Sequence, residues 1–136
     1  FEAQIADRYG QKYLPTFTRV ELNRDEDGYE IKPHTDAPHK VFTLIFYLPD
    51  DDTNSAFGTY IYQPKVKSFT SEAPTQFDSN LFEIRKALPY KPNTVFGFMK
   101  TDRSFHGRPA IKGLKGHRDW MNISIQVNTG SRQFDR

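Results

Sequence analysis

The stretch YEIKPHTDAPHKVFTLIFYLP, residues 29–49, combines two strand-like segments with a polar turn between them. Tyr29–Lys32 is short, whereas Val41–Leu48 is rich in β-branched and aromatic residues and gives the strongest strand signal in the chain. Between them lie His34 and Asp36. Side chains alternate along an extended backbone, so residues i and i+2 point to the same side. The turn therefore brings an imidazole and a carboxylate together.

The rest of the chain also consists mainly of short strand-like segments separated by turns. These segments are expected at Leu14–Arg24, Gly58–Tyr62, Phe82–Tyr90, Thr94–Lys100 and Arg118–Asn128, with His106 inside Ser104–Ile111. About eight strands with almost no helix predict an all-β sandwich or barrel, and we expect one domain over residues 1–136. Helical spacing of apolar residues predicts one short helix, over Phe1–Tyr13. Its shortness, and the absence of an initial Met, favour a chain trimmed at its front.

The last segment, Arg118–Asn128, alternates strictly between apolar and polar residues. One face carries Met121, Ile123, Ile125 and Val127, and the other carries Trp120, Asn122, Ser124 and Gln126. A polar inner face is typical of a barrel that holds a ligand instead of being filled by packed side chains.

Composition excludes several classes of function. The 12 Phe, 7 Tyr and 1 Trp predict a largely aromatic core. Because 19 basic residues nearly balance 17 acidic ones, we expect no nucleic-acid partner. The absence of cysteine excludes disulfides, iron–sulfur clusters and thiolate zinc sites, and fits a cytoplasmic location. No apolar run approaches the roughly 20 residues that span a bilayer, so no membrane partner is expected. The oligomeric state is left open.

A His-x-Asp pair is weak evidence for a metal site by itself. Four His and eleven Asp in 136 residues give roughly a third of one such pair by chance, and His117 and Asp119 form a second. We favour His34 and Asp36 because they precede the strongest strand, whereas no histidine follows the other pair. They would supply two-thirds of a 2-His-1-carboxylate metal site.

The third ligand should be a histidine that strand pairing brings close. The choice lies between His39, His106 and His117. His106 follows the strand-like Thr94–Lys100 through a tight connection and is preferred. His39 comes only three residues after Asp36, and we expect it to line the site or to face water.

The order of these motifs resembles that of the iron(II)- and 2-oxoglutarate-dependent dioxygenases. His34-x-Asp36 is followed by a distal His106 and, twelve residues later, by Arg118. The flanking PHTD, FYLPDDD, GTYIY and NTVFGFMKTDRSFHGRPAI are similar to prolyl-hydroxylase-type members, although Thr59 stands where these carry a second glycine. The resemblance covers about residues 17–127. It implies a double-stranded β-helix core, which is a jelly-roll or cupin-like barrel.

The resemblance also implies a reaction. His34, Asp36 and His106 would hold Fe(II), and 2-oxoglutarate and O₂ would fill the remaining positions. The products would be succinate, CO₂ and a hydroxylated protein side chain or small molecule. The flanking motifs, which are similar to those of prolyl-hydroxylase-type members, slightly favour a protein substrate. No catalytic residue beyond the metal ligands is expected. Halogenation is disfavoured because Asp36 supplies a carboxylate at the ligand position that related halogenases leave for halide.

By the same resemblance, the far carboxylate of 2-oxoglutarate needs a fixed cation, ideally a planar guanidinium group that binds both carboxylate oxygens. Arg118 is the preferred candidate. Tyr47 matches a position where related enzymes place a phenol on this carboxylate, although a core role fits it equally well. Asn122 and Ser124 share the face of Arg118 and could add hydrogen bonds.

Two other cations compete with Arg118. Lys115 lies nine residues after His106 in a glycine-flanked turn, and Arg108, two residues after it, could point into the cavity and touch substrate. Substrate is expected to enter over Phe57–Tyr62, the irregular segment 64–80 and the 23–28 turn.

Two rival functions remain at this point. A non-catalytic cupin-like barrel could bind a metal or small ligand as a sensor, but it would not need the cofactor cation. A zinc hydrolase is a further alternative, although no general base is evident beyond the ligands.

Overall fold

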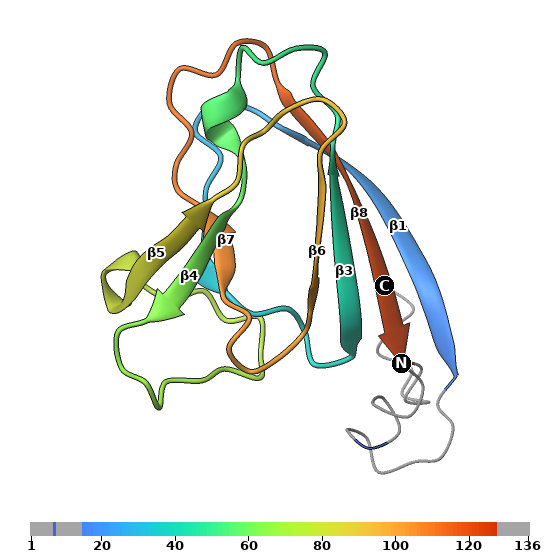
Figure 1. The fold of residues 1–136 in the computed structure, drawn as a ribbon, viewed down its shortest axis with the longest axis vertical. Helices are drawn as coiled ribbons and strands as arrows, with labels where there is room; N and C mark the ends of the chain where they lie inside the picture. Colours follow the sequence, from blue (N-terminus) through green and yellow to red (C-terminus); the bar gives the residue numbers. More distant parts are fainter. Residues whose placement is uncertain (1–6, 8–14, 128–136) are drawn as a thin grey trace.

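The computed structural model describes residue 7 and residues 15–127. Within this part, eight strands form two four-stranded antiparallel sheets that face each other (Figure 1). The strands are β1 (Thr16–Asp25), β2 (Ile31–His34), β3 (Lys40–Tyr47), β4 (Tyr60–Pro64), β5 (Phe82–Ala87), β6 (Val95–Met99), β7 (His106–Arg108) and β8 (Arg118–Val127). The expected all-β class is confirmed, but no ladder among these residues closes the two sheets into one barrel.

Helical structure within residues 15–127 is confined to the single 3₁₀ turns Ser55–Phe57 and Ser79–Leu81. The helix expected over Phe1–Tyr13 lies outside the described residues except for the single residue 7. No helix of the described part is long and apolar enough to cross a membrane.

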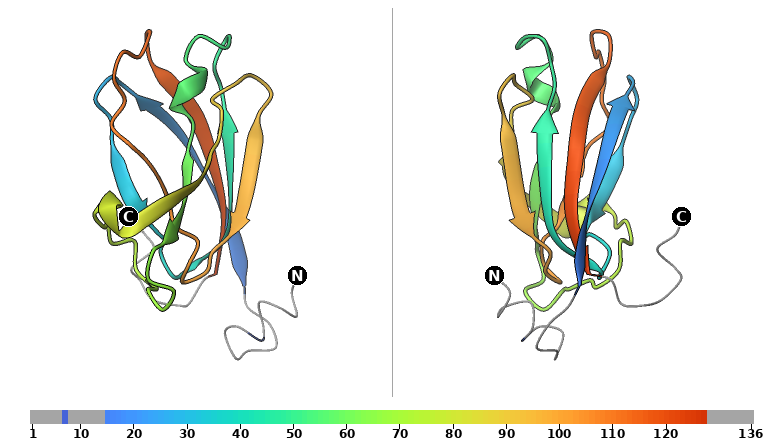
Figure 2. Two further views of the ribbon diagram at one scale, coloured as in Figure 1. Left: turned by 60° about the vertical axis from the view of Figure 1, so that its left-hand side comes forward. Right: turned by 90° about the vertical axis from the view of Figure 1, so that its right-hand side faces the viewer.

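The larger sheet has the order β1-β8-β3-β6, which the right-hand view of Figure 2 displays side by side. In its centre, Leu44 of β3 pairs with Ile123 of β8 on one side and with Gly97 of β6 on the other. Burial alternates along β3, so that Val41, Thr43, Ile45 and Tyr47 face the second sheet. This register determines which side chains can reach the space between the sheets.

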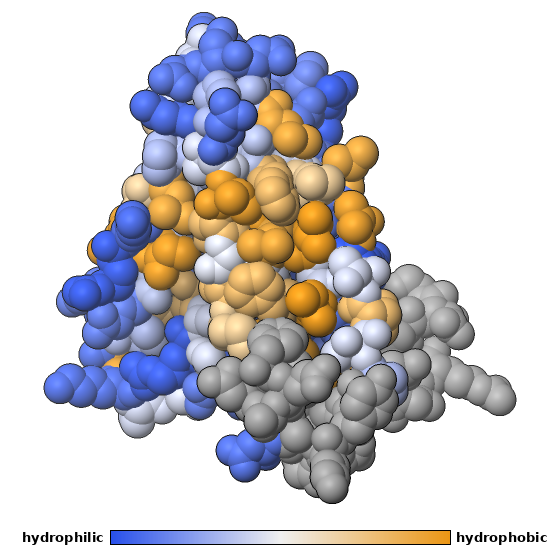
Figure 3. All heavy atoms as spheres, turned by 45° about the vertical axis from the view of Figure 1, so that its right-hand side comes forward, coloured by the Kyte–Doolittle hydropathy of each residue, from blue (hydrophilic) through white to orange (hydrophobic). Residues whose placement is uncertain are grey.

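The alternation predicted for β8 is present, and its polar face points inward. Asn122, Ser124 and Gln126 are buried, whereas Met121, Ile123 and Ile125 are only partly buried on the outer face. Figure 3, which turns this sheet toward the viewer, shows apolar side chains spread over it. The most exposed of them on β1 and β6 are Val20, Leu22, Val95 and Met99.

The core of the described residues is largely aromatic, as the composition predicts, and it contains two distinct clusters of buried side chains. One cluster contains Ile45, Tyr47 and Tyr90 beside the larger sheet. The other contains Tyr62, Phe82 and Phe105 beside the smaller sheet, which has the order β2-β7-β4-β5. Phe69 and Phe77 of the irregular segment 64–80 pack on this second cluster, so that segment is anchored by buried rings.

Candidate metal centre

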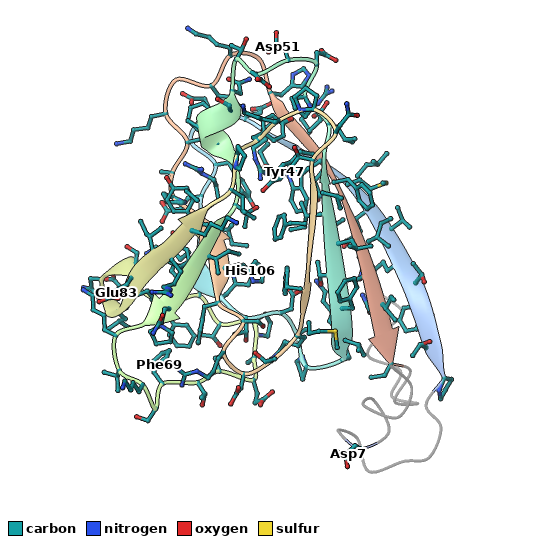
Figure 4. The ribbon with its side chains drawn as sticks, viewed as in Figure 1. Asp7, Tyr47, Asp51, Phe69, Glu83 and His106 are labelled. Atoms are coloured by element: carbon teal, nitrogen blue, oxygen red, sulfur yellow. The ribbon has the colours of Figure 1, made fainter. Side chains whose placement is uncertain are left out.

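The three predicted metal ligands meet between the sheets. His34 ends β2 and His106 begins β7, and the two are directly opposed across an antiparallel pair with ring centroids 4.5 Å apart. Asp36 follows in the turn after β2. The potential ligand atoms of the three residues all lie within 4.8 Å of one another. His106 is labelled in Figure 4, where it lies between the two sheets. This group could bind a metal ion.

Local sequence explains why β7 approaches β2 so closely. Gly107 lies between His106 and Arg108, and a Cβ atom there would lie 2.6 Å from the carbonyl oxygen of Ile31. Real Cβ atoms do not approach backbone oxygens that closely, so only glycine permits the pairing. The glycine thereby places His106 opposite His34.

Both histidine rings are oriented by the backbone. Nδ1 of His34 lies 3.0 Å from the carbonyl oxygen of Lys32, and Nδ1 of His106 lies 3.0 Å from that of Ser104. A neutral ring that donates through Nδ1 keeps the Nε2 lone pair for a metal. Burial lowers the pKa of both rings, and that of His106 falls to about 4, with the neighbouring His34 adding to the effect. Both rings are therefore neutral at pH 7.

The carboxylate of Asp36 is held by two side chains of β3. The hydroxyl of Thr43 donates to Oδ2 at 2.7 Å, and the ammonium of Lys40 lies 3.3 Å from Oδ1. Burial raises the pKa of the Asp36 carboxyl, but the electrostatic influence of His106 and Lys40 and the hydrogen bond from Thr43 together outweigh burial and lower the pKa overall. Asp36 is thus ionised as a metal ligand must be.

The turn between His34 and Asp36 is also braced from outside. The fully buried Thr35 donates from its hydroxyl to the carbonyl oxygens of Ser71, at 2.8 Å, and Ala73, at 3.3 Å. These carbonyls belong to the irregular segment 64–80, which the sequence assigned to substrate entry. In the structure this segment supports the backbone that carries two of the ligands.

A cavity of about 170 Å³ opens beside the three ligands. Arg108 and Arg118 are part of its wall, and Ile45 and Trp120 add apolar surface. A concave, partly apolar site with a few convergent charged groups is the usual form of a small-ligand pocket. The three metal ligands and the two arginines therefore line one cavity.

Arg118, the predicted cofactor anchor, lines this cavity but already has a carboxylate partner. Its Nη1 lies 2.5 Å from Oδ2 of Asp25, and both side chains are almost completely buried. Its Nε donates to the carbonyl oxygen of Phe57 at 2.7 Å. The indole of Trp120 also donates to Asp25, at 2.9 Å. Asp25 lies opposite Arg118 in the β1–β8 pairing, which the sequence does not reveal.

The other residues predicted to bind the cofactor occupy different positions. The Tyr47 hydroxyl donates to Oγ1 of Thr59 and accepts from its backbone N–H, and its ring packs on Arg118 behind the cavity wall. Ser124 is fully buried and accepts from Gln126. Of the three, only Asn122 lines the cavity, and among the described residues its Oδ1 is a buried side-chain atom with no hydrogen-bond partner.

The competing residues lie elsewhere. Lys115 and His117 line a separate, polar depression of about 310 Å³ near the loops at one end of the molecule. His39 is outside both the ligand group and the cavity wall. Of the alternative cations, Arg108 alone reaches the cavity. Its position two residues after His106 on a strand is the signal that indicated this.

Sequence reasoning missed the residues that support the ligands. Thr43 and Lys40 belong to the strongest strand, and Thr43 shares its inward face with Ile45 and Tyr47. That periodicity could have pointed to Thr43, but the contact with Asp36 depends on how the turn folds back.

No protein-family model matches this chain, and a search of curated proteins finds no match.

Proposed function

We propose that this chain is a non-haem Fe(II)- and 2-oxoglutarate-dependent dioxygenase that hydroxylates a C–H bond of a protein side chain or small molecule. The observation that carries the proposal is the buried group of His34, Asp36 and His106 at the edge of a cavity that also contains two arginines. Two imidazoles and one carboxylate are the donor set of non-haem iron oxygenases. When bound, Fe(II) and the keto acid together supply reduction of O₂ and hydroxylation of the substrate, with succinate and CO₂ as the other products.

The strand order supports the corresponding fold. An eight-stranded double-stranded β-helix has two facing antiparallel sheets, and the orders β1-β8-β3-β6 and β2-β7-β4-β5 are compatible with it. In that arrangement the ligands come from one sheet and the turn beside it, while β3 and β8 of the other sheet form the opposite cavity wall. This is where Thr43 and Arg118 lie.

The residues of the chain itself would orient the metal ligands, limit the access of water and bind the cosubstrate. The carbonyl oxygens of Lys32 and Ser104 hold both imidazoles with Nε2 available. Thr43 restrains one carboxylate oxygen of Asp36. The apolar wall formed by Ile45 and Trp120 limits access of water to the reacting atoms. An arginine of the wall would bind the far carboxylate of 2-oxoglutarate.

The test is an anaerobic titration of the metal-free protein with Fe(II) and then with 2-oxoglutarate. A metal-to-ligand charge-transfer band should appear, and it should be absent in His106→Ala but retained in the matched variant His117→Ala. Succinate release should follow when O₂ and substrate are admitted. If Fe(II) binds and no band forms with 2-oxoglutarate, the proposal is wrong.

One observation favours a different function. The buried Asp25 neutralises Arg118, the cation that the family pattern assigns to the cofactor. A metal-binding barrel that does not use 2-oxoglutarate, such as a sensor, would have no need for a free cation there. The same titration separates the two, because a sensor would bind metal without the keto-acid band.

A further inference from the structure

Arg108 differs from every other cation of the cavity wall in its surroundings. It follows His106 by two residues on β7, so both side chains project to the same side of the strand. Its side chain is buried, and residue 108 is 6% exposed. Adjacent positions on a strand are about 3.3 Å apart, so the two Cα atoms are separated by roughly 6–7 Å.

The contacts of the Arg108 guanidinium are neutral. Nε donates to the carbonyl oxygen of Pro109 at 3.0 Å, and Nη1 donates to those of Ala56, at 3.1 Å, and Gly58, at 2.7 Å. The Tyr60 ring lies 4.7 Å from the guanidinium carbon. Among residues 15–127 no carboxylate lies within ion-pairing distance of Arg108.

A buried cation without a counter-ion is unfavourable, because the protein replaces only part of its hydration. The other cations of the wall lack this deficit, since Arg118 pairs with Asp25 and Lys40 pairs with Asp36. An anion beside Arg108 would remove the imbalance.

We propose that Arg108, and not Arg118, binds the far carboxylate of a dicarboxylic keto acid whose other end lies at the metal. This inference rests on the proposed function. The carbon chain of such a ligand has four C–C bonds of about 1.5 Å and spans roughly 5 Å, comparable with the separation of His106 and Arg108 along β7. Arg118 then serves the fold by closing the β1–β8 end of the cavity with Asp25.

The test compares two keto acids of equal chain length, 2-oxoglutarate and 2-oxopentanoate, which lacks the far carboxylate. Both are titrated anaerobically into the Fe(II)-loaded protein, and binding is followed by the charge-transfer band. The wild type should prefer 2-oxoglutarate by at least about 30-fold, as expected for a buried charge-assisted contact. Arg108→Met should reduce that preference to less than about threefold, and Arg108→Lys should give an intermediate value.

Asp25→Asn provides an independent arm that leaves Arg108 intact. If Arg108 is the anchor, this variant keeps the wild-type preference. If Arg118 is the anchor, removing its competing carboxylate strengthens 2-oxoglutarate binding and raises the preference, which overturns the proposal. The 2-oxopentanoate band reports that each variant is folded and loaded with metal.

The outcomes also separate this inference from the function on which it rests. Absence of a band with either keto acid in the wild type contradicts the dioxygenase itself. A wild type that binds both keto acids, together with an unchanged preference in Arg108→Met, contradicts only the role of Arg108 and would assign that cation to substrate. If Arg108→Met does not fold, Arg108→Lys and Asp25→Asn decide the question.

Discussion

The chain contains two His-x-Asp pairs that have the same spacing and very different surroundings. His34 and Asp36 are 8% and 7% exposed, and His106 lies directly opposite the first of them. The side chains of His117 and Asp119 are 48% and 29% exposed, with 3.7 Å between His Nε2 and the nearer carboxylate oxygen. Spacing alone therefore brings imidazole and carboxylate together in both cases.

What differs is the set of partners that each carboxylate has. Asp119 receives two hydrogen bonds of 2.8 Å from Nε and Nη2 of Arg24, which occupy both of its oxygens. Asp36 is restrained by Thr43 on one oxygen, and its other oxygen lies 3.3 Å from the ammonium of Lys40 and also faces His106, 3.8 Å away. A metal site therefore needs a buried carboxylate with an oxygen directed at further ligands, in addition to the motif.

The largest expected effect comes from removing the carboxylate of Asp36, and removal of the Asp119 carboxylate is the matched comparison. Asp36→Ala should weaken Fe(II) binding by more than about 100-fold, since even loss of an outer support commonly costs 10–100-fold. Asp119→Ala deletes the same group from the same motif and should leave Fe(II) affinity within about twofold. Anaerobic calorimetry on both variants checks this pair. Similar losses in the two variants would mean that burial does not distinguish the pairs.

A smaller effect is expected from the hydrogen bond that orients Asp36. Thr43→Val preserves the shape of the side chain but removes the donor at 2.7 Å, and Fe(II) affinity should fall by about 10–100-fold. Thr59→Val is the matched control, because Thr59 is also buried in the cavity wall but contacts Tyr47 and not a ligand. Equal affinities in the Thr43 variant and the wild type would show that Asp36 does not need the Thr43 hydrogen bond for its orientation.

Much of the framework could be predicted from sequence because strand signals are local. Alternation in Arg118–Asn128 identified the inward polar face, and the order of motifs selected the three ligands that the structure brings together. The predicted strand Phe82–Tyr90 was too long, since β5 ends at Ala87, shortly before Pro89. Proline has no N–H to donate to a ladder.

The partners of the site residues depend on strand pairing between distant segments and could not be predicted in that way. Asp25 and Arg118 are 93 positions apart, and only the β1–β8 register makes them neighbours. A charged residue in an inward position indicates a site, but whether its charge is free or neutralised depends on the opposite strand. This is why the sequence favoured Arg118, whereas the contacts favour Arg108.

The third prediction concerns the stability of the metal-free protein in mild acid. Burial, and to a smaller extent the electrostatic effect of the neighbouring His34, lowers the pKa of His106 in the folded protein to about 4, whereas a histidine in the unfolded chain titrates near 6.5. Between these values the unfolded chain binds the extra proton, so stability is complete above pH 6.5 and decreases as the pH falls toward 4. From pH 7 to pH 5 the loss should be about 2 kcal/mol in urea unfolding.

The matched variants for this effect are His106→Ala and His117→Ala. The first should lose most of the pH dependence, and the second should retain it, because His117 is largely exposed. His34 shifts in the same direction and leaves a residual slope. The opposite ranking of the two variants would assign the acid sensitivity to the exposed pair.

The smallest effect is expected at the exposed pair itself. Arg24 and Asp119 have good bidentate geometry, but the Arg24 side chain is 60% exposed, and water screens an ion pair at such a position strongly. Arg24→Ala should therefore lower the free energy of unfolding by less than any of the other substitutions, as measured by urea unfolding. The difference from wild type should decrease further in 1 M salt, where the Debye length is about 3 Å.

The buried Arg118–Asp25 pair has comparable chemistry, and loss of one partner there should cost about 3–5 kcal/mol at any salt concentration. A cost for Arg24→Ala as large as that of losing one partner of the buried pair would mean that the outer pair is structural, and exposure would no longer explain why one motif forms a site and the other does not.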